Sequence, residues 1–353
     1  SIGLGDQPYD LPMIALSQEG GDQNVLRIPD TQTALTLGLG DDTQEARRLG
    51  RLYGETAKAF GANLVFGPML DVYDETTAFP DMVSRSFGND QNKVAAQGLA
   101  MAEGLRASGV IPVAKHFPGY ASSGYGADGS SVVMNGDFSE LARAIYPFRE
   151  AINNAIEGII VGHIAVPILD KDFPERPAAL SPILVSELLR NRWGYQGVII
   201  ADEMAFNEMT RSRPVERAVV EALKAGCDAV IFLDPNPRSI QSVIDAIERA
   251  VASGELSREQ LTMSEERLEA WRITLGADPF VEPDPINIEV AMLQELSAGV
   301  PAPAETLPVP TETPIPVVAP EAIAPETPKI PETAPVPVPT PEVVVPAPET
   351  TPA

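Results

Sequence analysis

The sequence predicts an α/β fold, and within that class a (β/α)8 TIM-type barrel. Short runs that are apolar on both faces alternate with helical patterns over residues 1–276. Strands that are apolar on both faces are typical of parallel sheets covered by helices. Such alternation over about 276 residues is most naturally closed as one barrel, and a hydrophobic content of 44% suffices for its core.

The elements follow one another in the order that this fold requires. The expected strands are residues 12–16, 64–70, 110–114, 158–161, 197–201 and 229–233. The expected helices are residues 43–60, 91–107, 138–156, 181–193, 214–225 and 237–252, with a last one after Ser257. Only six strands are clear and the chain starts abruptly on the first, so we expect one strand–helix unit to be missing upstream. Because Ser1 is neither Met nor the start of a signal-like run, we expect a processed form or a fragment.

Local signals place several helix ends. Ser181-Pro182 predicts an N-cap followed by proline in the first turn, and Ser257 with Gln260 predicts a capping box. Glycines are expected to end helices just before strands, at Gly109, Gly158 and Gly226. The Gly-Leu-Gly at residues 38–40 lacks the strand-then-helix fingerprint of a phosphate-binding loop, so we expect an ordinary loop there.

The C-terminal part has a different composition. Residues 301–353 contain 17 prolines and seven Glu, without glycine or aromatic residues. Such a segment cannot offset the entropy of ordering, so the sequence predicts a disordered acidic Pro-rich tail, either a spacer or wall-spanning stalk or an inert end. Residues 277–300 are the expected linker, with a short amphipathic helix at 286–297.

Charge and composition exclude several classes of function. The chain has 25 Lys+Arg against 50 Asp+Glu, a formal net charge of −25, which gives no attraction for nucleic acid or an anionic membrane. No apolar run is long enough to span a membrane. A single cysteine, Cys227, excludes an intrachain disulfide, and its place before a strand predicts a buried, unreactive thiol. The carboxylates at 170, 172 and 175 lack a calcium-loop spacing, so we expect no metal and no organic cofactor.

Polar residues follow each predicted strand. In chain order they are Ser17-Gln18-Glu19, Asp71, Lys115-His116, His163, Asp202-Glu203 and Asp234. In a parallel barrel the carboxyl ends of the strands form one mouth, so these groups are expected to converge on an active site. His163, alone after an apolar strand, is open to two interpretations: a site residue or a satisfied core histidine.

Several of these residues lie in longer motifs. The motifs are Gln18-Glu19-Gly20-Gly21, residues 66–72 (FGPMLDV), Arg85-Ser86-Phe87-Gly88, residues 115–119 (KHFPG), residues 179–182 (ALSP) and residues 194–204 (GYQGVIIADEM). In this order and over residues 11–275 they resemble family 3 glycoside hydrolases, particularly the single-domain β-N-acetylhexosaminidases that trim peptidoglycan.

The resemblance implies a retaining glycosidase. Asp202 takes the place of the nucleophile, which would form a glycosyl-enzyme. The implied substrate-binding residues are Lys115, His116, Arg85, Asp71, His163, Arg27 and Met204. The implied partner is a carbohydrate, and the protein is expected to be a monomer. It is expected to be secreted or bound to the cell envelope, otherwise cytoplasmic, with a tail that contacts the wall.

The chain departs from the family pattern at the acid/base. In the hexosaminidases a loop after KHFPG carries an Asp-x-His pair; here Asp128 stands for the Asp and Ser130 for the His. A serine hydroxyl is too weak an acid to replace imidazole. Ser17 replaces the Asp that grips sugar hydroxyls, and Asp22 replaces an Arg whose charge Arg27 could supply.

Three interpretations stay open. The first is an active glycosidase with a substituted acid, either Asp128 or Glu203, or with a substrate that has a good leaving group. The second is a catalytically silent sugar- or peptidoglycan-binding protein. The third is transfer or phosphorolysis, in which an outside nucleophile replaces water.

Overall fold

A six-stranded parallel sheet forms the centre of the molecule. The computed structural model describes residues 12–29, 31–73, 82–120, 123–126, 132–210 and 212–276. The strands pair in the order β1-β4-β5-β8-β9-β10, and every pairing is parallel. Their bounds are β1 Ala15–Leu16, β4 Leu64–Met69, β5 Ile111–Phe117, β8 Gly158–Val161, β9 Val198–Ala201 and β10 Ala229–Val230. All six predicted strands are confirmed.

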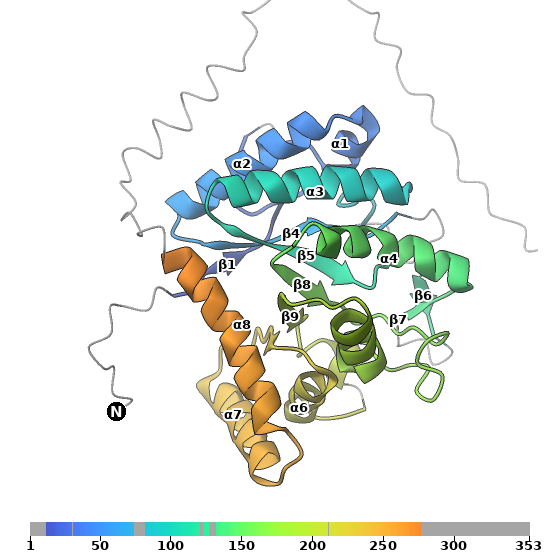
Figure 1. The fold of residues 1–353 in the computed structure, drawn as a ribbon, viewed down its shortest axis with the longest axis vertical. Helices are drawn as coiled ribbons and strands as arrows, with labels where there is room; N and C mark the ends of the chain where they lie inside the picture. The colour runs from blue at the N-terminus through green and yellow to red at the C-terminus, as the bar shows by residue number, and fades with distance from the viewer. Residues whose placement is uncertain are drawn as a thin grey trace, which may run out of the picture. The chain divides into compact units, whose positions relative to one another are not determined.

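The sheet curls into a half-barrel, with helices packed on its outer face (Figure 1). The expected closed eight-stranded barrel is not found among the described residues, where β1 pairs only with β4 and β10 only with β9. Both edge strands are two residues long, which leaves few backbone groups for closure. At the base, the last helix packs where closing strands would lie, since Trp271 and Leu275 belong to the same apolar cluster as Leu64 and Ile111.

The helices lie close to their predicted bounds. They are α1 Ala34–Gly40, α2 Thr43–Ala59, α3 Gln91–Ala107, α4 Phe138–Asn153, the 3-10 helix η2 Ala178–Leu180, the π-helix η3 Ile183–Arg192, α5 Asn207–Thr210, α6 Val215–Ala225, α7 Pro237–Ala252 and α8 Arg258–Gly276. Five of the α-helices begin after an N-cap residue whose short polar side chain accepts backbone N–H bonds. These caps are Thr33, Asp42, Asp90, Asp137 and Asn236.

Helix α1 overturns the expected loop at residues 38–40. Thr33 caps α1, and Gly38 lies inside it, where a Cβ would come within 1.6 Å of the Phe87 carbonyl oxygen. The glycine therefore allows close packing and does not mark a loop. Gly50 has the same role in α2, where a Cβ would lie 2.2 Å from the Met101 oxygen of α3.

Two predicted helix ends are wrong and three are confirmed. The Ser181 hydroxyl does not cap η3, because it donates to Asp170 Oδ2 at 2.7 Å. Gly158 lies in β8, and α4 ends instead at Asn154. Gly109 and Gly226 follow α3 and α6 with positive φ. The backbone N–H of Gln260 donates to Ser257 Oγ at 3.4 Å and so confirms the start of α8, but the Gln260 side chain donates to the Leu223 carbonyl, so the second bond of the predicted capping box is not made.

Two small antiparallel hairpins extend beyond the main sheet and were not predicted. One pairs β2 (Gln18–Gly20) with β3 (Gln23–Asn24), and the other pairs β6 (Ser123–Tyr125) with β7 (Val132–Met134). Both follow strands of the parallel sheet, β1 and β5, and therefore lie at its carboxyl end.

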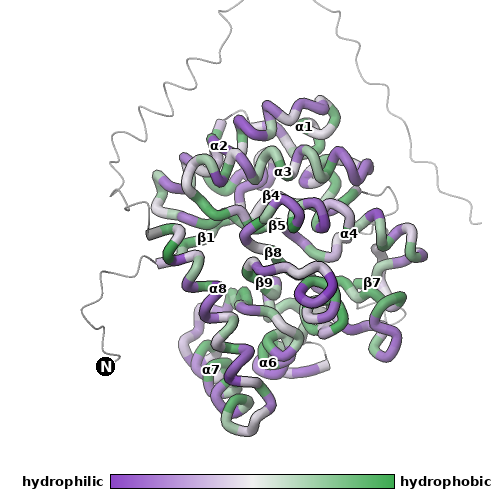
Figure 2. The backbone as a smooth tube through the Cα atoms, viewed as in Figure 1, coloured by the Kyte–Doolittle hydropathy of each residue, from purple (hydrophilic) through white to green (hydrophobic). Residues whose placement is uncertain are grey.

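The core lies between sheet and helices, and hydrophobic residues concentrate on the strands (Figure 2). Cys227 is buried there, and burial raises the pKa of its thiol, as expected for an unreactive cysteine. Within the described ranges, no helix is both long and apolar enough to cross a bilayer. The tail, the linker and its expected helix at 286–297 lie outside the described residues, so their boundaries stay predictions.

Candidate active site

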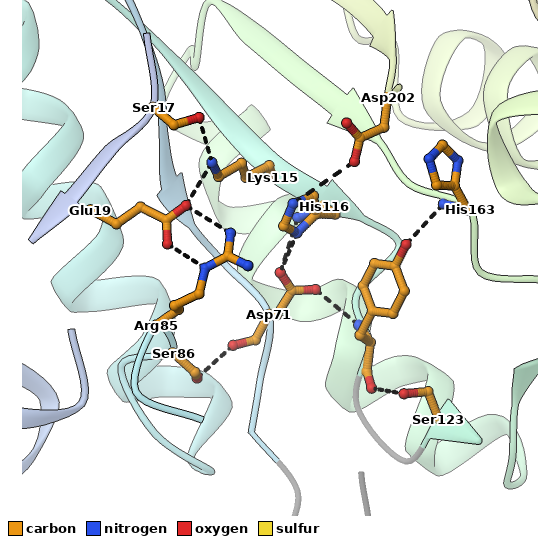
Figure 3. Close-up of polar contacts among 11 residues, drawn as sticks. Ser17, Glu19, Asp71, Arg85, Ser86, Lys115, His116, Ser123, His163 and Asp202 are labelled. Carbon is orange, nitrogen blue, oxygen red and sulfur yellow. Dashed lines mark hydrogen bonds and ion pairs between the residues drawn. The ribbon is translucent and has the colours of Figure 1, made fainter. Parts of the chain in front are cut away.

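The carboxyl end of the sheet brings together polar side chains from five strands (Figure 3). Asp71 follows β4, and Lys115 and His116 belong to β5. His163 and Asp202 follow β8 and β9. Parallel strands end at one edge, which is why Ser17 after β1 and Lys115 of β5, 98 positions apart in the chain, are hydrogen-bonded here.

Asp71 holds His116 in a fixed orientation. Its Oδ2 lies 2.9 Å from His116 Nδ1 and accepts the backbone N–H of the same residue at 3.1 Å. Its Oδ1 accepts the backbone N–H of Tyr120 at 2.9 Å. Because the buried carboxylate accepts from Nδ1, the other ring nitrogen is left to face Asp202, with Nε2 3.9 Å from Asp202 Oδ2.

Asp202 is an ionised carboxylate at the mouth. Burial by itself would raise its pKa, but His116, His163, the amide of Glu203 and Lys115 outweigh that effect and hold the pKa below the ordinary range. The amide of Glu203 donates to Oδ1 at 2.9 Å, so Oδ2 is directed toward His116. One quarter of the side chain is exposed, which leaves the carboxylate accessible from the mouth.

Glu19 holds two cations in place beside this pair. Arg85 donates to it through Nε at 2.6 Å and through Nη2 at 2.8 Å, and Lys115 Nζ lies 2.6 Å from Oε1. Burial opposes ionisation of Glu19, but the two cations outweigh it and lower its pKa to about 2. Lys115 also donates to Ser17 Oγ at 3.3 Å. The three charged groups form a buried floor of fixed geometry.

His163, which follows β8, lies on the side of Asp202 away from Glu19 and Lys115 (Figure 3). His163 is buried, and its backbone N–H donates to the Tyr120 hydroxyl at 2.9 Å. Its ring lies 5.5 Å from the ring of Phe206. Of the two interpretations left open by the sequence, this neighbourhood favours a residue at the mouth.

Comparison with known proteins identifies the chain's relatives. The family model described as "Glycosyl hydrolase family 3 N terminal domain" matches residues 6–270. This chain belongs to glycosyl hydrolase family 3. Family 3 relatives include an uncharacterized secreted glycosyl hydrolase of Arthroderma benhamiae, 32% identical over 271 residues and covering 75% of each chain. Another is the β-hexosaminidase LpqI of Mycobacterium tuberculosis, 33% identical over 267 residues, 72% of this chain and 66% of the relative.

Solved family 3 structures agree with the fold. The structure of M. tuberculosis LpqI matches with a TM-score of 0.64 at 30% identity, covering 74% of this chain and 76% of that one. CbsA from Thermotoga neapolitana matches with a TM-score of 0.67 at 26% identity, over 79% of this chain but only 61% of CbsA. Because the chain belongs to this family and its homologues are named as glycosyl hydrolases and β-hexosaminidases, it is a glycosidase-like hydrolase.

Three residues expected at the mouth, Arg27 and Met204 from the resemblance and Asp234 from its place after a strand, lie apart from the polar network. Arg27 is exposed after β3, and Met204 is fully buried in the hydrophobic core. Asp234 is half-buried, and its carboxylate accepts the backbone N–H of Asn236 at 2.9 Å and caps a turn. Asp128 and Ser130 lie outside the described residues.

Sequence reasoning missed two residues that build the site. The Ser86 hydroxyl donates to the Asp71 carbonyl at 2.7 Å and so ties the loop of Arg85 to β4. Tyr120 links Asp71 to His163 through its amide and its hydroxyl. Their places in the Arg85–Gly88 motif and directly after KHFPG were the available signals. The described ranges contain no group of three His, Cys, Asp or Glu side chains suited to a metal ion.

Proposed function

We propose that this chain is a β-N-acetylhexosaminidase-like glycosidase that cleaves β-linked, N-acetylglucosamine-containing cell-wall sugars with retention of configuration. Asp202 Oδ2 attacks the anomeric carbon, the bond to the leaving oxygen breaks, and a glycosyl ester forms. Water then attacks the same carbon and releases Asp202. The floor of Glu19, Arg85 and Lys115 supplies the polar groups that fix the sugar hydroxyls.

The observation that carries this proposal is the state of Asp202. A nucleophilic carboxylate must be ionised, accessible and oriented. Asp202 has a lowered pKa, one quarter of its side chain is exposed, and its Oδ1 accepts a hydrogen bond from the backbone N–H of Glu203. Asp71 fixes the orientation of the His116 ring, so that its Nε2 lies 3.9 Å from the other oxygen of Asp202. A carboxylate that only terminated a strand would need none of these neighbours.

Glu203 and Asp128 are the two candidates for the acid that donates a proton to the leaving oxygen. Glu203, one candidate, is buried, and its Oε1 accepts the amide of Ala205 at 2.8 Å while its Oε2 is closed off from solvent. This geometry suits a residue that supports the loop, so Asp128 is the remaining candidate. A general acid contributes about 10²–10⁴-fold. We therefore propose slow turnover of sugars with poor leaving groups and faster turnover of activated aryl glycosides.

An aryl N-acetyl-β-glucosaminide tests the proposal, because its leaving group departs without a proton. We expect Asp202→Ala to lower aryl alcohol release by about 10³-fold or more. Asp234→Ala is the matched control: it removes another aspartate that follows a strand and should leave the rate unchanged. Azide should accelerate the wild type by replacing water as the second nucleophile. Equal rates for wild type and Asp202→Ala would contradict the glycosidase.

A silent sugar-binding protein is the alternative, favoured by Ser130 and Ser17 at positions where the family has His and Asp. Such a protein would bind the sugar without Asp202-dependent release of aryl alcohol. Ser130→His separates the two. A gain of activity on unactivated substrates supports a glycosidase that lacks its acid, and unchanged inactivity with retained binding supports the silent protein.

We propose that the protein acts outside the cytoplasm, as a monomer on wall carbohydrate. The Arthroderma relative is named a secreted glycosyl hydrolase, and the Pro-rich composition of residues 301–353 suits a spacer. Fractionation of the source cells tests this location, and recovery in the cytoplasm alone would contradict it.

A further inference from the structure

Exposed aromatic side chains gather at the end of the sheet that holds Asp202. Among the described residues the exposed aromatics are Phe60, Tyr125, Phe138, Phe173 and Phe206. Tyr125 lies on the β6–β7 hairpin, Phe138 at the start of α4, and Phe173 and Phe206 in loops after β8 and β9, all beyond the carboxyl ends of strands, whereas Phe60, at the C-cap of α2, lies at the base. Most of the exposed aromatic surface of the described residues therefore lies at the end of the sheet that holds Asp202.

Phe206 is the member of this group nearest to the proposed nucleophile. It comes four residues after Asp202, and its ring lies 5.5 Å from the ring of His163, at an angle of 39°. His163 in turn is close enough to Asp202 for its charge to lower that carboxylate's pKa, and the two side chains are neighbours in Figure 3. One imidazole therefore separates Phe206 from the reacting group.

The backbone fixes Phe206 although its side chain is exposed. Its carbonyl oxygen accepts the amides of Met209 at 3.0 Å and Thr210 at 3.1 Å, and the Thr210 hydroxyl at 3.0 Å. The ring nevertheless remains 54% exposed. Covering the exposed ring with a ligand is favourable, and because the backbone is already fixed, little main-chain entropy is then lost.

The two sides of Asp202 differ in chemistry. Glu19, Arg85 and Lys115 lie on one side of the Asp202–His116 pair, and His163 lies on the other (Figure 3). The charged floor suits the many hydroxyls of the sugar that Asp202 attacks. An aromatic face suits the C–H face of a neighbouring sugar ring, which is the apolar part of a carbohydrate.

We propose that Phe206 is the stacking platform for the sugar on the leaving-group side, so that the site recognises a β-linked N-acetylglucosamine oligosaccharide and not only a single sugar. This inference rests on the proposed function, because it takes Asp202 as the attacking group. The platform binds and positions substrate. It takes no part in bond cleavage.

Calorimetric titration of the full chain tests the platform, with Asp202→Asn as the parent variant so that no substrate is consumed. The probes are N,N′,N″-triacetylchitotriose and the monosaccharide N-acetylglucosamine. We expect Phe206→Ala to weaken trisaccharide binding about 3–10-fold and to leave monosaccharide binding unchanged. Phe60→Ala, an equally exposed phenylalanine at the base, is the matched control and should change neither affinity.

Two further variants separate stacking from simple cover of His163. Phe206→Trp keeps an aromatic face and should retain trisaccharide affinity, whereas Phe206→Leu keeps an apolar cover and should lose it. Wild-type affinity in Phe206→Leu, a Phe206→Ala result equal to that of Phe60→Ala, or no trisaccharide binding by the parent would overturn the inference. If binding depends on Phe206 but the wild type hydrolyses no aryl glycoside, the platform stands and the proposed activity fails.

Discussion

The acid limb of the pH profile depends on the contact between Asp202 and His116. Asp202 is active when ionised, and its lowered pKa should keep kcat/KM for an aryl glycoside level until the pH falls below about 4, the ordinary Asp value. His116→Asn removes the second-largest influence on that pKa and the largest that lowers it. We therefore expect the acid limb of His116→Asn to move to higher pH. A limb at the same pH in both proteins would contradict this role of His116.

Glu19 links the floor of the site to stability. Its pKa is about 2 in the folded protein against an ordinary 4.5, so its contribution is complete above pH 4.5 and is lost as the pH falls toward 2. The shift corresponds to about 3 kcal/mol. Glu19→Gln should thus be less stable than wild type at pH 7, and urea unfolding should show this difference shrinking by about 3 kcal/mol between pH 5 and pH 2. A difference independent of pH would show that Glu19 is not ionised in the fold.

At the scale of elements, Asp228 joins three of them at the base. The buried carboxylate accepts the amide of Ile199 in β9 at 2.8 Å, contacts Arg190 of η3, and accepts Ser264 Oγ at 2.8 Å and Arg267 Nη1 at 2.9 Å from α8. Removing it leaves buried cations uncompensated, so Asp228→Ala should lower the free energy of unfolding by about 3–5 kcal/mol.

Glu103→Ala provides the comparison for that prediction. Glu103 pairs with Arg47 on the surface, where both side chains are more than two-fifths exposed, and its loss should cost about 1 kcal/mol or less. Urea unfolding of both variants measures the two costs. Equal costs would contradict the assignment of Asp228 as the junction of η3, β9 and α8.

The elements were predictable where local pattern decides them. Apolar runs predicted the six strands and helical patterns between them predicted most helices, since both signals act over a few residues. Local pattern does not predict helix α1, because Gly38 and Gly40 favour a loop and the close approach of Phe87 that requires a glycine at position 38 is a tertiary contact. Ser181 was misassigned because its hydroxyl bonds Asp170, a partner 11 positions away that no local pattern shows.

The candidate site was predictable in its members but not in its connections. Strand ends brought Asp71, Lys115, His116, His163 and Asp202 to one mouth, as the topology requires. The connections depend on side-chain packing between strands. Glu19 forms ion pairs with both Arg85 and Lys115, and the Tyr120 hydroxyl accepts the backbone N–H of His163. Met204 and Arg27 were placed by motif alone, and the structure puts one in the core and the other at the surface.

At the scale of the whole described fold, the two ends of the half-barrel carry different groups. The carboxyl ends of the strands carry Asp202, the charged floor and most of the exposed aromatics, whereas the base carries Asp228 and the apolar cluster under α8. Closure of the sheet was not predictable from local periodicity, because it depends on how edge strands and α8 compete for the same inner face. Substitutions at the base should therefore change unfolding and leave sugar binding intact.

Trapping the glycosyl-enzyme tests the central claim, that Asp202 is the nucleophile of a retaining glycosidase, most directly. The full chain is incubated with an N-acetylglucosaminyl fluoride carrying a second fluorine at C5, which slows hydrolysis of the ester, and is then analysed by intact mass and peptide mapping. We expect the mass to rise by one glycosyl unit located on Asp202, and no labelling of Asp202→Ala. Absence of an adduct on wild type, or an adduct on any other carboxylate, would contradict the claim.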